Sequence, residues 1–142
     1  MPNVIVISGA NGAGKSTLAP YLLRDTFDIT EYVNAHTIAE GLSAFASEAA
    51  AFDAGRIMLK RLNELAAERM DFAFETTLAS RSYAKRLSTL QSSGYHFHLF
   101  YLWIKSSQLA VERVRARVRL GGHDISEATI NRRYERGRLN FV

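Results

Sequence analysis

The sequence predicts an α/β fold in which helices cover both faces of a mostly parallel sheet, giving three layers. Apolar segments typical of buried strands alternate with segments of helical periodicity along the chain. The first apolar segment, residues 3–8, runs directly into a glycine-rich turn and then into a helical pattern. The chain has 142 residues and is 47% hydrophobic, which is enough for one core. We therefore expect a single domain over residues 1–142.

The turn after the first strand carries a phosphate-binding motif. Residues 9–17 read GANGAGKST and match the pattern G-x-x-x-x-G-K-[ST] between a strand and a helix. The glycines allow positive φ angles, so several backbone N–H groups can turn toward one anion. Lys15 supplies a cation for the β- and γ-phosphates, and the Ser16 hydroxyl can bind Mg²⁺. A glycine-rich turn that only caps a helix is the alternative, and the full match disfavours it. The predicted nucleotide-binding residues are Gly9, Ala10, Asn11, Gly12, Ala13, Gly14, Lys15, Ser16 and Thr17.

The other elements follow in alternation. Short apolar runs rich in β-branched and aromatic residues predict strands at 31–34, 71–75 and 95–104. Helical spacing and helix-ending glycines predict helices at 15–24, 47–70, 81–93, 107–120 and 127–137, the last capped by Ser126. Residues 35–46 are expected to form a loop. Ligands gather at the carboxyl ends of parallel strands, so we expect the site to contain residues 9–17, 34–36 and 75–77.

Composition excludes several functional classes. There is no cysteine, so disulfides, thiolate zinc sites and cysteine nucleophiles are excluded. No apolar run reaches the ~18 residues of a membrane span, and a strand starting at residue 3 leaves no room for a signal peptide. We expect a cytoplasmic protein with no membrane partner.

Positive charge is concentrated in the last quarter of the chain. Residues 1–104 hold 9 Lys/Arg and 10 Asp/Glu, whereas residues 105–142 hold 9 Lys/Arg and 4 Asp/Glu. Such an excess is typical of nucleic-acid binding or of arginines that clamp a nucleotide, and the phosphate loop favours the second. The arginines best placed to close over a γ-phosphate are Arg119, Arg132 and Arg133. Arg113 to Arg119 recur at every second residue, so they spread around a helix, and we expect most of them to be solvated.

Glu75 follows a predicted strand, where an acidic side chain can hold Mg²⁺ or its water shell. The alternative is a solvated Glu75 beside a Thr77 that caps a helix. The base-reading motif N-K-x-D of GTPase switches is absent.

Several segments together resemble one family. Beyond the phosphate loop they are Asn34-Ala35, Ile38-Ala39, Gly41-Leu42-Ser43, Ala54-Gly55-Arg56, residues 72–78 (FAFETTL), Arg81-Ser82-Tyr83, residues 113–119 (RVRARVR), residues 121–125 (GGHDI) and Arg132-Arg133-Tyr134. The chain resembles the zeta-toxin/sugar-nucleotide kinase family, in particular its short bacterial members. The resemblance runs through nearly the whole chain, and residues 74–78 (FETTL) and 117–125 are its more specific parts.

The resemblance implies an ATP- and Mg²⁺-dependent kinase that phosphorylates a hydroxyl group of UDP-N-acetylglucosamine or a related small molecule. It implies catalytic roles for Lys15, Arg119, Arg132 and the residue at position 36. It also implies acceptor binding by Glu48, Arg56, Glu75 and Thr76, and metal binding by Ser16 and Glu75. Some members of the family are the toxin of a toxin–antitoxin pair, so an antitoxin protein is a candidate partner.

The chain departs from the family pattern at three places. The family has Asn-Ala-Asp after the second strand, and its acid deprotonates the substrate hydroxyl, whereas this chain has His36. A neutral imidazole can accept a proton but lacks the carboxylate's charge. Prolines of the family pattern are replaced at Ala44, Ser47 and Ser126. Family members also continue past Asn140 through a further strand and helix, so we expect a domain shortened at its C-terminus.

Three functions remain open from the sequence. The leading one is an ATP-dependent kinase of a small hydroxyl compound, with His36 in the base position. The second is a nucleotide-binding remnant of such a kinase without transfer activity. The third is a basic nucleic-acid-binding module, which is disfavoured because aromatic residues are not interleaved with the basic residues of 105–138.

Overall fold

A computed structural model describes residues 1–45, 48–121 and 124–141. Its centre is a four-stranded sheet in the order β2-β3-β1-β4. The strands are β1 (Asn3–Gly9), β2 (Tyr32–Val33), β3 (Phe72–Thr76) and β4 (His96–Leu102). Every pair of neighbouring strands is parallel. The α/β prediction with a parallel sheet is confirmed.

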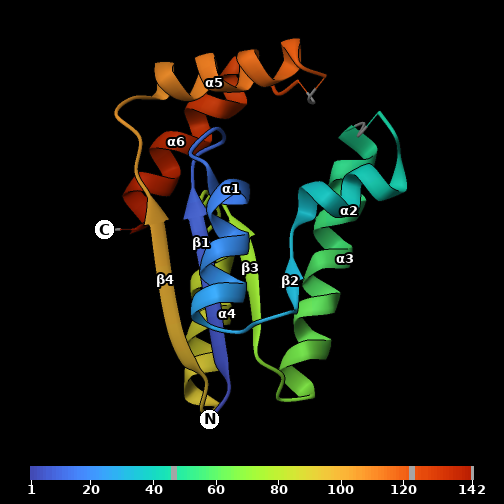
Figure 1. The fold of residues 1–142 in the computed structure, drawn as a ribbon, viewed down its shortest axis with the longest axis vertical. Coiled ribbons are helices and arrows are strands. Elements are labelled where there is room, and N and C mark those ends of the chain that lie inside the picture. Colours follow the sequence, from blue (N-terminus) through green and yellow to red (C-terminus); the bar gives the residue numbers. More distant parts are fainter. Residues whose placement is uncertain (46–47, 122–123, 142) are drawn as a thin grey trace.

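Alternation along β1 explains the layers on either side of the sheet. Val4 and Val6 point into one core, and Ile5 and Ile7 point into the other. Because successive side chains of a strand lie on opposite faces, β1 needs a helix on both sides. The first face packs against α3 (Glu48–Ala67) and α4 (Ser82–Ser92), and the second against α1 (Lys15–Pro20) and η1 (Tyr21–Thr26). Figure 1 shows α1 in front of the sheet and α4 behind it.

Two further helices, α5 (Ser107–Arg119) and α6 (Glu127–Phe141), lie across the carboxyl end of the sheet (Figure 1). They share a third core with the end of the first strand, since Ala10 packs with Val114, Ile130 and Tyr134. The Tyr134 hydroxyl donates to the carbonyl oxygen of Ile104, 2.9 Å away. The two most arginine-rich helices are thereby fixed beside the glycine-rich turn.

The expected elements are present with shifted ends, and one element was predicted wrongly. Residues 35–42, expected to form part of a loop, form helix α2 (Ala35–Leu42). Asn34 caps it, because its Oδ1 accepts the backbone N–H of His36 at 2.9 Å. The helix packs along α3, so tertiary contacts outweigh the weak helical propensity of its Thr and Gly. The predicted helix start at Ser47 and the helix-ending residue Gly122 lie outside the described residues.

The helix changes type after Pro20, where α1 ends and η1 begins. Pro20 has no backbone N–H and stands where the first helix ends. The next turn widens, and Phe27 N–H donates to the carbonyl oxygen of Leu22, five residues back. The helix after the phosphate loop therefore continues to residue 26, close to the predicted end at 24.

Candidate active site

The glycine-rich turn adopts the conformation that its glycines permit. Gly9, Gly12 and Gly14 all have positive φ angles, of 146°, 83° and 96°. A Cβ atom at Gly9 would lie 2.7 Å from the carbonyl oxygen of Leu102, so no side chain fits there. A Cβ atom at Gly14 would meet nothing within 4 Å. The turn is therefore closed toward the sheet and open at the start of α1, where a phosphate would lie.

Lys15 folds back over this turn. Its Nζ donates to the carbonyl oxygens of Gly9, at 2.5 Å, and Ala10, at 3.3 Å. Burial of the ammonium group lowers the Lys15 pKa to about 8, although the Glu75 carboxylate acts to raise it. Arg133 and Arg117 lower the pKa further. Lys15 thus carries a buried ammonium group whose charged form a bound anion would stabilise.

Glu75 stands at the end of β3 and joins three elements. Its Oε1 lies 3.4 Å from the Ser16 hydroxyl on α1, and its Oε2 accepts a 2.9 Å hydrogen bond from the hydroxyl of Tyr32 on β2. The parallel register explains the meeting, because Ser8 at the end of β1 pairs with Thr76 at the end of β3. A solvated Glu75 is therefore not what the structure shows.

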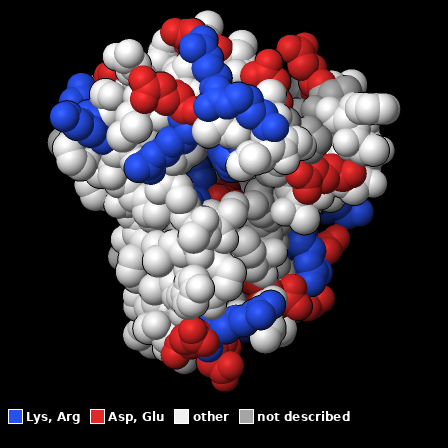
Figure 2. Space-filling model, turned by 45° about the horizontal axis from the view of Figure 1, so that its top comes forward, with Lys and Arg blue, Asp and Glu red and all other residues white. Residues whose placement is uncertain are grey.

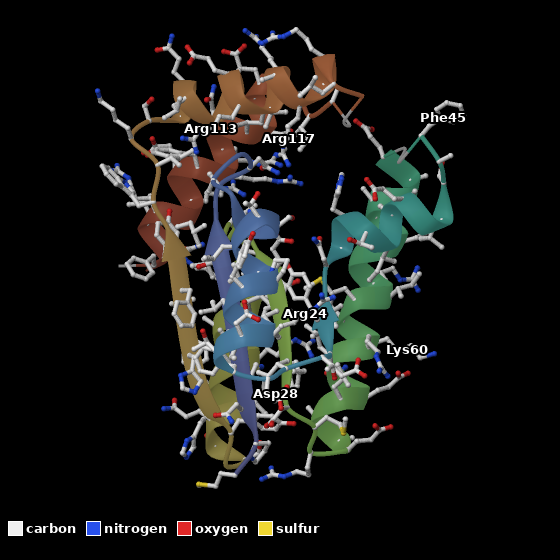
Figure 3. All side chains as sticks on the ribbon, viewed as in Figure 1. Arg24, Asp28, Phe45, Lys60, Arg113 and Arg117 are labelled. Atoms are coloured by element: carbon white, nitrogen blue, oxygen red, sulfur yellow. The ribbon has the colours of Figure 1, made fainter. Side chains whose placement is uncertain are left out.

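Two arginines donate hydrogen bonds to the loop, and the charge of a third, Arg117, acts on Lys15 within it. Arg113 Nη1 donates to the carbonyl oxygen of Gly12 at 3.2 Å, and Arg133 Nη1 donates to Asn11 Oδ1 at 3.4 Å. Arg117 lies one turn beyond Arg113 on the same side of α5, as Figure 3 shows. Arg133 is half-buried, and this burial lowers its pKa, with Arg132 adding to the effect. In Figure 2, Lys and Arg side chains border a hollow in this end of the molecule.

Of the three arginines predicted from the sequence to close over the γ-phosphate, Arg133 bonds to the loop. Arg119 and Arg132 are both exposed, and within the described part of the chain neither forms a hydrogen bond with the loop. Neither is among the groups that shift the Lys15 pKa, whereas Arg117 and Arg133 are. Arg113 and Arg117 are four residues apart, a spacing that places them on one helix face, and this spacing was the signal available in the sequence. The roles of Arg119 and Arg132 stay predictions.

His36 lies in the first turn of α2, just beyond the carboxyl end of β2. Its Nε2 is 3.1 Å from Oε1 of Glu40, one turn along the helix, and both side chains are about half-exposed. A carboxylate only accepts hydrogen bonds, so this contact orients the ring with its proton on Nε2. Because His36 closely follows β2, it lies at the carboxyl edge of the sheet, where the sequence predicted it.

The predicted acceptor-binding residues come from two regions. Glu48 and Arg56 are exposed on α3, at its first residue and two turns on. Thr76 follows Glu75, and its Oγ1 accepts the backbone N–H of Leu78 at 3.0 Å. Leu78 is buried and has a positive φ of 60°, a conformation costly for a non-glycine residue. This strained turn after β3 was not predicted from the sequence.

No cluster of three or more His, Cys, Asp or Glu side chains suited to a metal occurs among residues 1–45, 48–121 and 124–141. In the same part of the chain, none of the helices combines the length and the hydropathy needed to cross a lipid bilayer.

Several solved structures share this fold. A chain of the Pnkp1/Rnl/Hen1 RNA repair complex superposes with a TM-score of 0.77 at 18% identity, covering 99% of this chain and 45% of that one. The PezAT chromosomal toxin–antitoxin system of Streptococcus pneumoniae gives a TM-score of 0.77 at 15% identity, covering 99% and 62%. A gluconokinase from Sinorhizobium meliloti 1021 gives 0.59 at 19% identity, covering 95% and 74%. This chain thus spans about half to three quarters of the length of these neighbours, and the likeness establishes a P-loop kinase-like fold.

Sequence comparison gives a closer relation. An uncharacterised protein of Haemophilus influenzae is 32% identical over 130 residues, which is 92% of this chain and 91% of that protein. The family model described as zeta toxin matches residues 1–141. The loop, the acidic residue after β3 and the arginine-rich helices lie within that match, and the chain belongs to the zeta toxin family.

Proposed function

We propose that this chain transfers the γ-phosphoryl group of ATP to a hydroxyl group of a small molecule. The observation that carries the proposal is the convergence of Lys15, Ser16 and Glu75 with three arginines at one loop. Phosphoryl transfer needs positioning and positive charge more than covalent chemistry. The zeta toxin family and the kinase-like fold support the same class of reaction.

The donor atoms beside the loop suit Mg²⁺. Ser16 Oγ and Glu75 Oε1 are hard oxygen donors 3.4 Å apart. Mg²⁺ binds through one or two protein oxygens together with phosphate oxygens and water. We propose that Ser16 and Glu75 hold the ion of Mg·ATP, which would supply charge neutralisation at the phosphates.

The remaining side chains would share the steps of transfer. Lys15 would exchange its carbonyl partners for phosphate oxygens, and Arg113, Arg117 and Arg133 would neutralise charge that develops during transfer. The acceptor oxygen bonds to the γ-phosphorus while the bond from that phosphorus to the bridging oxygen of ADP breaks. His36 would take the proton of the acceptor hydroxyl. Glu48, Arg56, Glu75 and Thr76 are the proposed acceptor-binding residues, and UDP-N-acetylglucosamine is the first acceptor to test.

Lys15→Ala tests the nucleotide-binding step. The variant loses charge-assisted contacts worth roughly 1.5–3 kcal/mol each, so we expect ATP affinity to fall by more than tenfold in a calorimetric titration. Lys60→Ala is the matched control, because Lys60 is exposed on α3 and points away from the loop (Figure 3). Unchanged ATP affinity in Lys15→Ala would contradict the proposal.

A catalytically inactive nucleotide-binding remnant is the second candidate, and His36 in place of the family's acid favours it. ADP release with Mg·ATP and a panel of hydroxyl acceptors separates the two. The remnant would bind ATP without acceptor-dependent ADP release. A titration with single-stranded RNA at two salt concentrations tests the nucleic-acid alternative, since phosphate contacts make such binding strongly salt-dependent.

An antitoxin protein is a further proposed partner. The support is the family and the toxin–antitoxin system named for one structural neighbour. Purification of this chain together with the product of an adjacent gene, followed by measurement of ATP affinity with and without that product, tests the proposal.

A further inference from the structure

The two carboxylate oxygens of Glu75 have different partners. Oε1 faces the Ser16 hydroxyl at 3.4 Å, and Oε2 accepts the Tyr32 hydroxyl at 2.9 Å. The carboxylate is therefore held from both sides, by α1 on one and by β2 on the other. Glu has a long side chain with a terminal torsion that rotates over a broad range, so one fixed oxygen decides where the second one points.

Strand register places Tyr32 where it can do this. Tyr32 pairs with Ala73 in the parallel β2–β3 ladder. Ala73 and Glu75 are two residues apart, so their side chains lie on the same face of the sheet. Tyr32 packs against the core of that face together with Ile5, Ile7 and Ala73. Its ring is thus braced by the core while its hydroxyl reaches the end of the neighbouring strand.

A phenol suits this position because it donates without adding charge. A tyrosine hydroxyl has an ordinary pKa of about 10, so it carries its proton at neutral pH and donates to the carboxylate. A lysine or arginine at this place would neutralise Glu75 and weaken its hold on a cation, whereas Tyr32 fixes the carboxylate and leaves its charge intact.

We propose that Tyr32 is a positioning residue for Glu75: its hydroxyl holds Oε2 so that Oε1 stays beside Ser16 Oγ as the carboxylate ligand of the divalent cation. The inference rests on the proposed function, because it concerns the cation of bound Mg·ATP. Tyr32 touches neither the nucleotide nor the cation in this scheme and acts only through Glu75.

Tyr32→Phe removes the hydroxyl and keeps the ring. Mn²⁺ is the probe, because it takes the same oxygen ligands as Mg²⁺ and its binding to the protein–ATP complex can be followed by electron paramagnetic resonance. We expect Mn²⁺ affinity to fall about tenfold, the lower end of the range for residues that orient metal ligands. ATP affinity measured with a chelator in place of metal should be unchanged.

Tyr83→Phe is the matched control. Tyr83 is also half-buried and stacks on Phe74, but its hydroxyl lies 3.9 Å from Met58 Sδ, in the core on the other face of the sheet. We expect wild-type Mn²⁺ affinity in this variant. A double variant of Tyr32→Phe with Glu75→Ala should bind Mn²⁺ no more weakly than Glu75→Ala alone, because the hydroxyl then has nothing to position.

Three outcomes overturn the proposal. The first is wild-type Mn²⁺ affinity in Tyr32→Phe. The second is a loss of ATP affinity that is equal with metal and with chelator, which would assign the hydroxyl to nucleotide binding or to folding. The third is an additive loss in the double variant. Wild-type protein that binds no ATP would overturn the proposed function as well, whereas wild-type protein that binds Mn·ATP beside an unaffected Tyr32→Phe would overturn the Tyr32 proposal alone.

Discussion

The backbone of α6 at Gly137 lies directly against the carbonyl oxygen of Thr77, with no room for a Cβ atom between them. The same turn after β3 is held a second time, because Asn140 Nδ2 donates to the carbonyl oxygen of Leu78 at 2.6 Å. Helix α6 also carries Arg133, which bonds to the phosphate loop. This helix therefore connects the turn that follows Glu75 to the loop that follows β1.

Gly137→Ala should separate these two parts of the site. The added methyl group meets backbone, which cannot move aside as a flexible side chain can, so we expect a loss of about 1–3 kcal/mol in the free energy of unfolding. Urea denaturation measures it. Gly55→Ala is the control: Gly55 is inside α3 and an added Cβ meets nothing within 4 Å. That variant should gain roughly 0.5–1 kcal/mol. Equal stability of the two variants would contradict the close approach of α6.

The lowered pKa of Lys15 predicts a pH dependence of ATP binding. In the free protein Lys15 is protonated below pH 8 and loses its proton as the pH rises through about 8. Bound phosphate favours the charged form, so ATP binding above pH 8 must also take up a proton. We expect ATP affinity to fall by up to about tenfold per pH unit from pH 8 upward. The phosphates are fully ionised over that range, since their second pKa lies near 6.

Calorimetry at pH 7.5, 8.5 and 9.5 tests this, and Lys15→Ala is the reference. The difference in ATP affinity between the wild type and the variant should shrink as the pH rises. A difference that stays constant from pH 7.5 to 9.5 would mean that Lys15 remains charged in the free protein.

The arginines should divide by whether their charge acts on Lys15 in the phosphate loop. Arg117→Ala and Arg133→Ala should lower the transfer rate at least tenfold, the scale of a lost donor to developing charge being about 10²–10³. Arg119→Ala and Arg132→Ala are the matched controls from the same two helices, because neither residue is among the groups that shift the Lys15 pKa. Single-turnover transfer assays at saturating ATP measure all four. Larger losses in Arg119→Ala and Arg132→Ala would instead support the catalytic roles predicted for these two residues from the sequence.

The sequence locates the phosphate loop but leaves open which arginines lie beside it. The phosphate loop could be located because local backbone demands fix its residue types, as the positive φ of Gly9, Gly12 and Gly14 shows. The choice among arginines depends instead on how α5 and α6 are rotated against the loop. That rotation follows from the core around Ala10, Val114 and Ile130, which joins Ala10 to residues more than a hundred positions away along the chain.

Tyr32 and α2 were missed for related reasons. Tyr32 looked like an ordinary strand residue, and only the register of β2 against β3 brings its hydroxyl to Glu75. Helix α2 begins at the Asn34 cap, a recognisable signal. Its Thr and Gly residues lowered the helical propensity, and the packing along α3 that compensates for them is not local.

His36→Asp tests the residue that departs most clearly from the family pattern. If His36 stands in the base position, the aspartate restores the family's acid and should raise phosphoryl transfer to a sugar-nucleotide acceptor. A positioned base contributes roughly 10²–10⁴-fold. The neighbouring Glu40 complicates this substitution. Its carboxylate lies 3.1 Å from the His36 ring and would repel an aspartate of like charge. Glu40→Gln combined with His36→Asp removes that repulsion and serves as the paired variant.

Acceptor-dependent ADP release at pH 6 and pH 8 distinguishes the possible roles of His36, once each protein is shown to bind ATP. A wild-type rate that rises between these pH values, together with a His36→Asp rate that does not, means that the imidazole itself is the base, since a base must be unprotonated to act. An inactive wild type with recovery in His36→Asp, or in its Glu40→Gln pair, identifies a kinase inactivated at this position. Equal rates in the three proteins at both pH values would show that position 36 lies outside the mechanism, because neither the charge nor the basicity of its side chain would then affect the transfer step.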